Sequence, residues 1–496
     1  MSKDVLQDRQ EAAVIDVGSN SVRLVVYRVD GRALTPILNE KVMAGLGRDV
    51  AKTQQLSPDG IETAMRALRR FATLTEALGV DDVYAVATAA VREAMDGPAF
   101  ADRVKRETGI KLRVLSGDEE ARLSALGVSA GAPDANGVVG DLGGASLELI
   151  EISPSGPGRG ETFPLGPLAL GAETPFDYDR IAARTVEELN AVQMLTRGGG
   201  DFYAVGGAWR ALGRIDIRLR NHPLGVLHHH EMSRAEVLQL VDLVRKQSKR
   251  SLEKLEEAAA KRADTLPYAA VVLEQVMRVG GFERVILSAF GLREGVLIER
   301  MSKAALAEHP LIASAEAFAG PTLRSRKFGR ALDQWIAPMF AAQGPVFGAH
   351  DRVLRGAAAR LADLGGPLHP DQRVEIMFDL VLRAPLAAIS HEERAFLAAA
   401  IHHRYTKSAP RHAEAFLRLL SEERQAAAAL GAALRLGADI SGRSEALLSK
   451  VSVEAAEGKL VLTADRSAAH LVTETAGRRL DTVAAALGLK AEQQLS

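Results

Sequence analysis

The pattern of apolar and polar residues changes near residue 308, which predicts two kinds of domain in this chain. Before that point, short apolar runs such as 12–15, 83–88 and 112–115 alternate with stretches of helical spacing. Beyond it, Ala-rich helical spacing dominates and is interrupted by Gly/Pro pairs. Alternating strands and helices are typical of α/β folds, whereas sustained helical spacing indicates a mainly α-helical region.

The pattern also predicts individual elements. In the first region we expect strands at 12–27 (a strand, turn and strand), 34–44, 83–88 and 112–115, and helices at 61–78, 91–108 and 118–127. Gly79 and Gly109 follow the first two helices, as helix-ending glycines do. A linker at 130–137 precedes a second set of strands, and the late segment 459–463 predicts a small hairpin. The predicted domains are therefore residues 1–133, 134–308 and 309–496.

A nine-residue pattern occurs twice, 125 positions apart. Residues 16–24 read DVGSNSVRL and residues 141–149 read DLGGASLEL, so Asp, Gly, Ser and Leu recur at the same offsets. Both copies lie between apolar runs, which predicts a strand, a tight Gly/Ser turn and a second strand. One such motif is an ordinary turn signal, but an internal repeat in matching contexts indicates a duplicated structural unit.

These repeated turns have the residue types that bind phosphate. Small residues in a turn expose backbone N–H groups and hydroxyls to an anion, and an Asp at a strand end can hold a divalent cation directly or through water. Two such hairpins, one from each half of a duplicated unit, would hold a phosphate chain from both sides.

Four other segments carry candidate chemistry. Arg92 lies in a first helical turn, where it would reach a phosphate or pair with Glu93. Glu119 and Glu120 open a helix, and either would serve as a general base or simply oppose the helix dipole. Gly206 and Gly207 connect a strand to a helix and would form a further phosphate-approach loop. In the segment 288–297, Arg293 and Glu294 could pair, and we expect a structural role for the segment.

Composition narrows the class of protein. The chain has 496 residues and no Cys. This excludes disulfides, a thiol nucleophile and zinc held by cysteines. It has no apolar run long enough to span a membrane and no signal-peptide core, so we expect a cytoplasmic protein. The net charge of −1 argues against general binding of polyanions by the whole chain. Within 321–360, however, seven basic residues occur with only two acidic ones, Asp333 and Asp351. This local excess of positive charge would suit a polyanion.

Together these motifs resemble the exopolyphosphatase/guanosine pentaphosphate phosphohydrolase family of the actin-like ATPase superfamily. The segments that carry the resemblance are DVGSNSVRL, ATAAVREA, SGDEEARL, DLGGASLEL, VGGAWR and SAFGLREGVL, in this order between residues 16 and 297. The implied fold is α/β, with two duplicated actin-like (ribonuclease H-like) domains followed by a mainly α-helical, HD-like domain.

The resemblance also implies roles for residues of this chain. Glu120 would be the catalytic base, with Glu119 as the alternative, and Asp141 and Glu148 would hold Mg²⁺. A monovalent cation such as K⁺ is a second candidate cofactor. The residues expected to bind substrate phosphates are Gly18, Ser19, Asn20, Ser21, Arg92, Gly143, Gly144, Ala145, Ser146, Gly206 and Gly207. Ala145 replaces a more common Gly, which would add strain if that position needed a positive φ.

In the helical domain, Ala362 precedes Asp363 where an HD dyad would have its His, so we expect no second metal site there. The remaining histidines are expected to be structural or solvated, although the segment 402–407 would also suit a polyanion path. The loop at 228–230 resembles a family loop, and three adjacent histidines are too local to predict a metal site.

The predicted function is Mg²⁺-dependent removal of terminal orthophosphate from inorganic polyphosphate. The alternative substrate is guanosine pentaphosphate, which would be converted to the tetraphosphate, because the phosphate machinery is the same. An actin-like kinase and a nucleotide sensor are less favoured, since the retained acidic residues suit hydrolysis. No membrane or nucleic-acid partner is expected, and relatives imply a homodimer.

Overall fold

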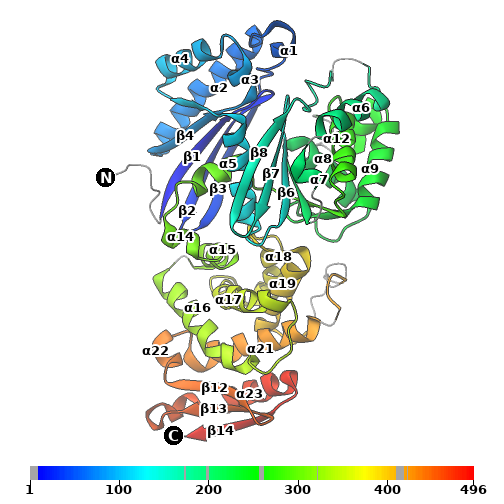
Figure 1. Ribbon diagram of the computed structural model, residues 1–496. Coiled ribbons are helices and arrows are strands. Elements are labelled where there is room, and N and C mark those ends of the chain that lie inside the picture. Colours follow the sequence, from blue (N-terminus) through cyan, green and yellow to red (C-terminus); the bar gives the residue numbers. More distant parts are fainter. Residues whose placement is uncertain are drawn as a thin grey trace. The chain divides into compact units, whose positions relative to one another are not determined.

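A computed structural model gives the fold of residues 9–495, apart from 172–174, 191, 197–199, 256–261, 321, 409–417 and 422. The chain divides into two compact units, residues 1–307 and 308–496 (Figure 1). The predicted boundary at 133–134 falls inside the first unit and stays a prediction.

The first unit contains two sheets. The first sheet has the order β3-β2-β1-β4-β5 and the second has the order β10-β11-β9-β6-β7-β8. The strands are β1 Arg9–Val17, β2 Ser21–Asp30, β3 Ala33–Met43, β4 Asp82–Ala87, β5 Leu112–Val114, β6 Gly137–Leu142, β7 Leu147–Ser153, β8 Gly156–Phe163, β9 Asp201–Val205, β10 Glu231–Ser233 and β11 Arg284–Leu287.

The two sheets have the same topology, which explains the sequence repeat. In each, an antiparallel three-strand meander (β1-β2-β3 or β6-β7-β8) continues into two parallel strands (β4-β5 or β9-β11). Strand β10 adds an antiparallel edge to the second sheet alone. The nine-residue pattern therefore occupies the first hairpin of each sheet, as the sequence predicts.

Helices cover the sheets and connect their strands. Those of the first unit are α1 Val50–Thr53, α2 Pro58–Ala77, α3 Ala89–Glu93, α4 Gly97–Thr108, α5 Gly117–Gly131, α6 Tyr178–Leu189, α7 Gln193–Thr196, α8 Gly207–Leu219, α9 Arg234–Lys246, α10 Lys249–Leu255, α12 Leu266–Val279, α13 Leu292–Ile298 and α14 Lys303–Ala307. The predicted helix at 61–78 is confirmed, and Pro58 at its first turn explains its earlier start.

The predicted single helix over 91–108 is wrong, because the chain forms α3 and α4 instead. Ala94 is extended, with ψ of 136°, and ends α3. Pro98 lies in the first turn of α4, where it fits a helix start better than a helix interior. The Asp96 carboxylate accepts a hydrogen bond from the Leu56 N–H at 2.9 Å, which fixes the break.

Helix α5 lies between the two sheets and carries the predicted acidic pair at its start (Figure 1). Leu123 belongs to a core cluster with Ala12 and Val14 of β1, whereas Ala121 and Ala125 pack with Val139 and Ile150 of the second sheet. Both faces of β1 are buried, which accounts for its continuous apolar run. The sequence prediction of this helix is confirmed, with four further residues at its end.

Helices α5 and α13 occupy equivalent places after β5 and β11, and they cross at two glycines. A Cβ on Gly127 would lie 2.0 Å from the Gly291 carbonyl oxygen, and one on Gly295 would lie 1.8 Å from that of Leu123. Only residues without a side chain permit this approach. The crossing joins the two halves of the duplicated unit.

The second unit is mainly helical, as predicted. Its helices are α15 Pro310–Ala319, α16 Leu323–Ile336, α17 Asp351–Leu361, α18 Pro370–Leu382, α19 His391–Tyr405, α21 Glu423–Ser441, α22 Glu445–Leu448 and α23 Glu474–Leu487, with 3₁₀ turns at Ala337–Phe340, Gly348–His350 and Arg466–Leu471. The predicted hairpin is present as β12 Val451–Ala456 and β13 Lys459–Ala464, and β14 Lys490–Leu495 adds a parallel strand that the pattern does not reveal.

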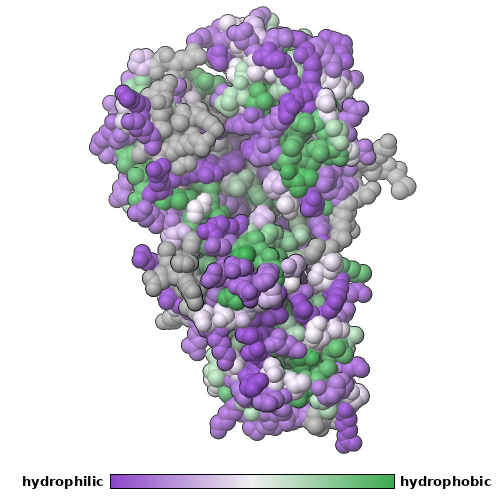
Figure 2. Space-filling model, turned by 180° about the vertical axis from the view of Figure 1, so that it is seen from behind, coloured by the Kyte–Doolittle hydropathy of each residue, from purple (hydrophilic) through white to green (hydrophobic). Residues whose placement is uncertain are grey.

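Among the helices described, none combines the length and the apolar character needed to cross a bilayer. The face of the molecule in Figure 2 is mostly hydrophilic, and its apolar residues form separate patches.

Candidate active site

Each copy of the repeat forms the same tight turn at the tip of a hairpin. The Gly18 N–H donates to the Ser21 carbonyl at 3.0 Å, and the Gly143 N–H donates to the Ser146 carbonyl at 2.9 Å. The two turns lie against each other, since a Cβ on Gly144 would be 3.3 Å from the Ser19 Cβ. The fold therefore brings together two segments that are 125 positions apart in sequence.

The turns leave backbone N–H groups without protein acceptors. In the described part of the chain, the N–H groups of Ser19, Asn20, Gly144 and Ala145 donate to neither a backbone carbonyl nor a side chain. Their carbonyls, by contrast, are bonded. Ser19 accepts from Gly47 at 2.8 Å, and Gly144 accepts from Leu168 at 2.9 Å. Turns that are held through their carbonyls and present free donors are suited to an anion.

A cavity of about 530 Å³ opens beside the turns. Ser19 and the Ala145–Ser146 pair line it, together with Arg48 and Arg184. These two arginines lie outside the sequence motifs, and the pattern analysis missed them.

Asp141 and Glu148 lie opposite each other where β6 pairs with β7. The side chain of Glu148 is buried, and its Oε1 atom has no hydrogen-bond partner among the described residues. The Asp141 carboxylate accepts a hydrogen bond from Ser124, a residue of α5 that the sequence analysis also missed. A buried carboxylate oxygen without a partner costs free energy unless a cation or a proton compensates it. This pair therefore fits a hard divalent cation such as Mg²⁺.

Across the described residues, no three carboxylates around this pair bring oxygen atoms within 4.8 Å of one another. The arrangement suits an ion held by one or two carboxylates with water and substrate oxygens completing its shell, which is the usual mode for Mg²⁺.

The acidic pair at the start of α5 separates into two environments. Glu119 forms a capping box with Ser116 and an ion pair with Arg113 at 2.7 Å, so it stabilises the helix start. Glu120 is buried and accepts a hydrogen bond from Arg92 Nη1 at 3.0 Å. The second Nη atom of Arg92 lies 3.6 Å from Glu93, so the predicted contact with Glu93 is present, and the predicted contact with a phosphate stays a prediction.

The acidic residues of this region influence each other's protonation. Burial raises the pKa of Glu120 to about 7, although the hydrogen bond from Arg92 opposes the rise. Burial also raises the pKa of Asp141. The pKa of Glu148 lies well above its usual value because of burial and the nearby charges of Glu120 and Asp141. These three predicted residues therefore share one electrostatic environment with Arg92.

Five cationic side chains surround the same region, and they are the main feature that the motif search missed. Burial lowers the pKa of Arg210 to about 10, and the neighbouring charges of Arg293 and Arg23 lower it further. Lys41 is an exposed residue whose ammonium group is partly desolvated. That desolvation, with the charges of Arg262, Arg23 and Arg210, lowers its pKa to about 8. Strand pairing explains part of the cluster, since Lys41 lies opposite Arg23.

Burial would lower the pKa of Arg293, but the charge of Glu294 helps to raise it, so the predicted pair interacts electrostatically while the direct contacts of each side chain are with other residues. Arg293 Nη1 lies 3.2 Å from Asp16 Oδ2, at the end of the first repeat strand. Glu294 instead accepts a hydrogen bond from the Tyr27 hydroxyl at 2.5 Å. Arg293 therefore belongs to the cationic cluster, and Glu294 anchors α13 to β2.

Gly206 and Gly207 follow β9, which pairs with β6 so that Val205 lies opposite Asp141. A Cβ on Gly207 would lie 2.5 Å from Arg262 Nη2, so this glycine makes room for a cationic side chain. The expected strain at Ala145 is absent, because its φ is not positive.

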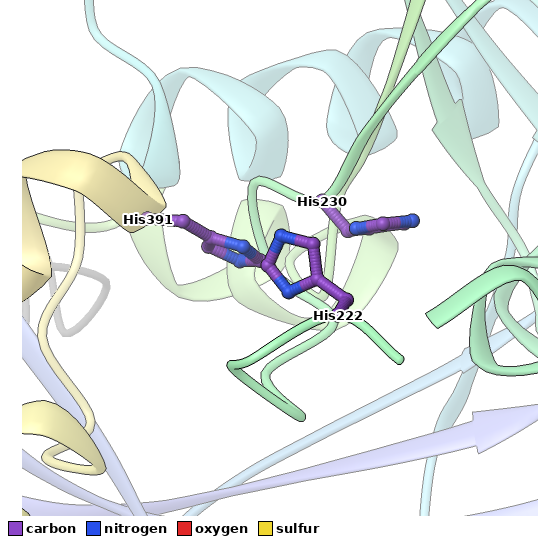
Figure 3. A group of neighbouring side chains, drawn as sticks. All are labelled: His222, His230 and His391. Atoms are coloured by element: carbon purple, nitrogen blue, oxygen red, sulfur yellow. The ribbon is translucent and has the colours of Figure 1, made fainter. Parts of the chain in front are cut away.

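The loop between α8 and β10 carries His222 and His230, whose side chains are drawn in Figure 3. His230 Nε2 lies 2.9 Å from Asp216 Oδ2, and His222 Nδ1 lies 2.9 Å from the Leu224 carbonyl oxygen. His229 Nε2 lies 2.8 Å from the Gly131 carbonyl oxygen at the end of α5. These contacts tie the loop to neighbouring elements of the first unit.

The basic stretch of the second unit is largely neutralised. Arg326 and Arg330 pair with Glu316, and Arg355 and Arg360 pair with Asp333. Four of its seven basic residues thus have acidic partners, which weakens the interpretation of this stretch as a polyanion path.

Comparison with known proteins places this geometry in context. Exopolyphosphatase 1 of Mycobacterium tuberculosis is 28% identical over 306 residues, which cover 59% of this chain and 88% of that protein. The guanosine-5'-triphosphate,3'-diphosphate pyrophosphatase of Aeromonas hydrophila is 27% identical over 295 residues, 58% of each chain. The crystal structure of the Ppx/GppA family member from Aquifex aeolicus has a TM-score of 0.52 and 26% identity, covering 58% of this chain and 97% of that one.

Two family models match the two units separately. The model described as "Exopolyphosphatase, C-terminal" matches residues 311–493. The model described as "Ppx/GppA phosphatase family" matches residues 25–304, more than half of the chain. Since this match contains most of the motif segments and every helix and strand from β3 to α13, the protein belongs to the Ppx/GppA phosphatase family.

Proposed function

We propose that this protein is a Mg²⁺-dependent exopolyphosphatase, which releases terminal orthophosphate from inorganic polyphosphate between the two halves of its first unit. One observation carries the proposal: two turns with free N–H groups lie beside Glu120 and the unpartnered buried oxygen of Glu148. The similarity to exopolyphosphatase 1 supports the choice of substrate.

The turns Gly18–Ser21 and Gly143–Ser146 would position the terminal phosphates by donating their free N–H groups. Arg92 would add positive charge, which favours the charge that develops in phosphoryl transfer. The cluster of Arg23, Lys41, Arg210, Arg262 and Arg293 would bind phosphates further along the chain. Five cations near one site suit a substrate whose charge extends over many groups.

Glu120 would act as the general base. A water oxygen attacks the terminal phosphorus, its proton passes to the Glu120 carboxylate, and the P–O bond to the rest of the chain breaks. The products are orthophosphate and a polyphosphate shortened by one unit. The pKa of Glu120, near 7, suits a base that works near neutral pH. Asp141 and Glu148 would hold Mg²⁺, which when bound neutralises charge on phosphate oxygens.

The test is phosphate release by the purified protein with Mg²⁺. Long-chain polyphosphate, guanosine pentaphosphate and ATP are compared at equal phosphate concentration. Glu120→Gln should lower kcat by about 10²–10⁴-fold while substrate still binds. Glu119→Gln is the matched control, because it changes the adjacent carboxylate, which pairs with Arg113 and not with Arg92. An unchanged kcat in Glu120→Gln would refute the base assignment, and no release from any substrate would favour a sensor or a kinase.

Guanosine pentaphosphate is the second candidate substrate, because the Aeromonas hydrophila pyrophosphatase is nearly as similar to this chain. A preference for this nucleotide, with saturable inhibition by the tetraphosphate, would transfer the proposal to it. A preference that rises with polyphosphate length would support the first candidate.

A further inference from the structure

The second unit contains a polar cavity of about 490 Å³ that none of the motifs predicts. Residues of helices α18, α19 and α21 line it, together with residues from 363–366 and 442–443. Its side chains include four arginines and two aspartates: Arg373, Arg404, Arg435, Arg443, Asp363 and Asp439. The volume lies within the range of small-molecule sites, about 300–1,000 Å³.

Both aspartates already have cationic partners. Asp363 Oδ1 accepts a hydrogen bond from Arg443 Nη1 at 3.0 Å. Asp439 Oδ2 accepts one from Arg479 Nε at 3.0 Å, and Arg435 Nε lies 3.8 Å from the same oxygen. Neither aspartate forms an ion pair with Arg373 or Arg404, although the charges of both aspartates act on Arg404 from a distance.

Arg404 is the central feature of the cavity. It is only 8% exposed, and it makes no hydrogen bond or ion pair with any residue that the structure describes. Its guanidinium group lies over the Tyr405 ring, with 4.9 Å between Cζ and the ring centroid. Burial lowers the pKa of Arg404, as expected for a cation removed from water. A buried guanidinium without an acceptor is costly unless an anion binds it.

Arg373 adds a second cation with spare donors. Its Nη2 donates to the Leu368 carbonyl at 3.1 Å, while its buried Nε has no partner among the described residues. It also lies over the Tyr405 ring, 5.6 Å from the centroid. The Tyr405 hydroxyl is occupied, because it donates to the Ala362 carbonyl and accepts from the Gly365 N–H.

We propose that this cavity, which we name the Arg404 pocket, binds a compact phosphate-bearing anion at a site separate from the hydrolytic one. Guanidinium groups recognise phosphate through several N–H donors at once. The Tyr405 ring already carries two guanidinium groups, so the pocket suits phosphate groups better than an aromatic base. Orthophosphate, pyrophosphate and tripolyphosphate share this chemistry. The proposal does not depend on which substrate the first unit hydrolyses.

The test uses isothermal titration calorimetry of the full-length protein with pyrophosphate in EDTA, where Mg²⁺-dependent hydrolysis is absent. Two binding events are expected for the wild type, one in each unit. Arg404→Gln should weaken one event at least tenfold, whereas Arg92→Ala should weaken the other. Lys327→Gln is the matched control, since it removes an exposed cation from the same unit.

Further arms identify the ligand and separate binding from folding. Orthophosphate, tripolyphosphate and ATP are titrated in the same way, and circular dichroism confirms that each variant is folded. Arg404→Lys, which keeps the charge, should retain part of the affinity. If Arg404→Gln is unfolded, Arg373→Gln takes its place at the same pocket. ATP binding tighter than tripolyphosphate, in an Arg404-dependent way, would support the pocket and assign it to a nucleotide.

Two outcomes would overturn the proposal. One is a folded Arg404→Gln protein that binds pyrophosphate at both sites with wild-type affinity. The other is a single binding event in the wild type that only Arg92→Ala removes. If Glu120→Gln loses hydrolysis but keeps the Arg404-dependent binding of pyrophosphate, the Arg404 pocket binds its anion independently of the hydrolytic site.

Discussion

At the scale of single residues, the candidate active site concentrates charges that oppose folding. Glu148 has a buried oxygen without a partner, and Arg210 lies near Arg293 and Arg23. Such groups are costly in the free protein and become favourable when an oppositely charged ligand arrives. Residues of this kind are expected where function, rather than stability, selected the side chain.

Glu148→Gln should therefore stabilise the metal-free protein while abolishing Mg²⁺-dependent activity. The pKa of Glu148 is raised in the folded state, so above the pKa of an unfolded glutamate this residue destabilises the fold. In EDTA at pH 7, the Tm of the variant should rise by ~2–4 °C for each kcal/mol that the substitution adds to the free energy of unfolding. That advantage should shrink as the pH falls towards about 4.3.

Thermal unfolding with EDTA and with Mg²⁺ measures both effects. Mg²⁺ should stabilise the wild type and the Glu119→Gln control but not Glu148→Gln. A wild type that gains no stability from Mg²⁺, or a variant that gains as much, would contradict the assignment of Glu148 as a metal ligand.

Lys41 gives a prediction for the alkaline side of the pH profile. With a pKa of about 8, its ammonium group is charged below that pH and loses its proton as the pH rises through it. Because the charge would attract the polyanion, kcat/KM should fall severalfold between pH 7 and 9. Lys41→Arg keeps its charge over this range and should flatten the fall. A fall of the same size in both proteins would show that another group titrates.

At the scale of elements, the crossing of α5 and α13 fixes the position of Glu120. Gly295→Ala would place a Cβ within 2 Å of the Leu123 carbonyl oxygen, so the two helices must move apart. We expect a loss of about 1–3 kcal/mol in the free energy of unfolding, as overpacked cores show, and a lower kcat. Denaturant unfolding and phosphate release test this.

Gly225→Ala is the control for that substitution, because no atom lies within 4 Å of the added Cβ. It should leave stability and kcat close to the wild-type values. If Gly295→Ala were equally harmless, the close approach of the two helices would not be what positions Glu120.

The elements also show what the sequence can and cannot predict. The repeat predicted the two hairpins, and the pair Gly206 and Gly207 predicted a strand-to-helix connection, because glycine turns and apolar strands are local signals. Local signals did not reveal the cationic cluster, since Arg23, Arg210 and Arg262 come together only through sheet pairing and helix packing. The break between α3 and α4 was missed because its hydrogen bond to Leu56 is not local.

At the scale of the whole molecule, the two units carry separate features. The match to exopolyphosphatase 1 of Mycobacterium tuberculosis covers 59% of this chain and 88% of that protein. Most of that protein therefore corresponds to about three fifths of this chain. Four hydrophobic core clusters of the first unit contain only residues up to 306, and Arg32 Nη1 donates to the Leu306 carbonyl at 2.8 Å. Core residues that do not depend on the second unit are typical of a domain that can fold alone.

A chain truncated after Ala307 should therefore fold and still release orthophosphate from tripolyphosphate, with kcat within about tenfold of the full-length value, a difference of about 1.4 kcal/mol in the barrier. It should lose the Arg404-dependent binding of pyrophosphate, because that pocket lies wholly in the second unit. Circular dichroism, phosphate release and calorimetry on the truncated and full-length proteins check these points. A folded truncated protein without activity would show that hydrolysis needs the second unit. Retention of both binding events would instead place the two anion sites in the first unit and contradict the Arg404 pocket.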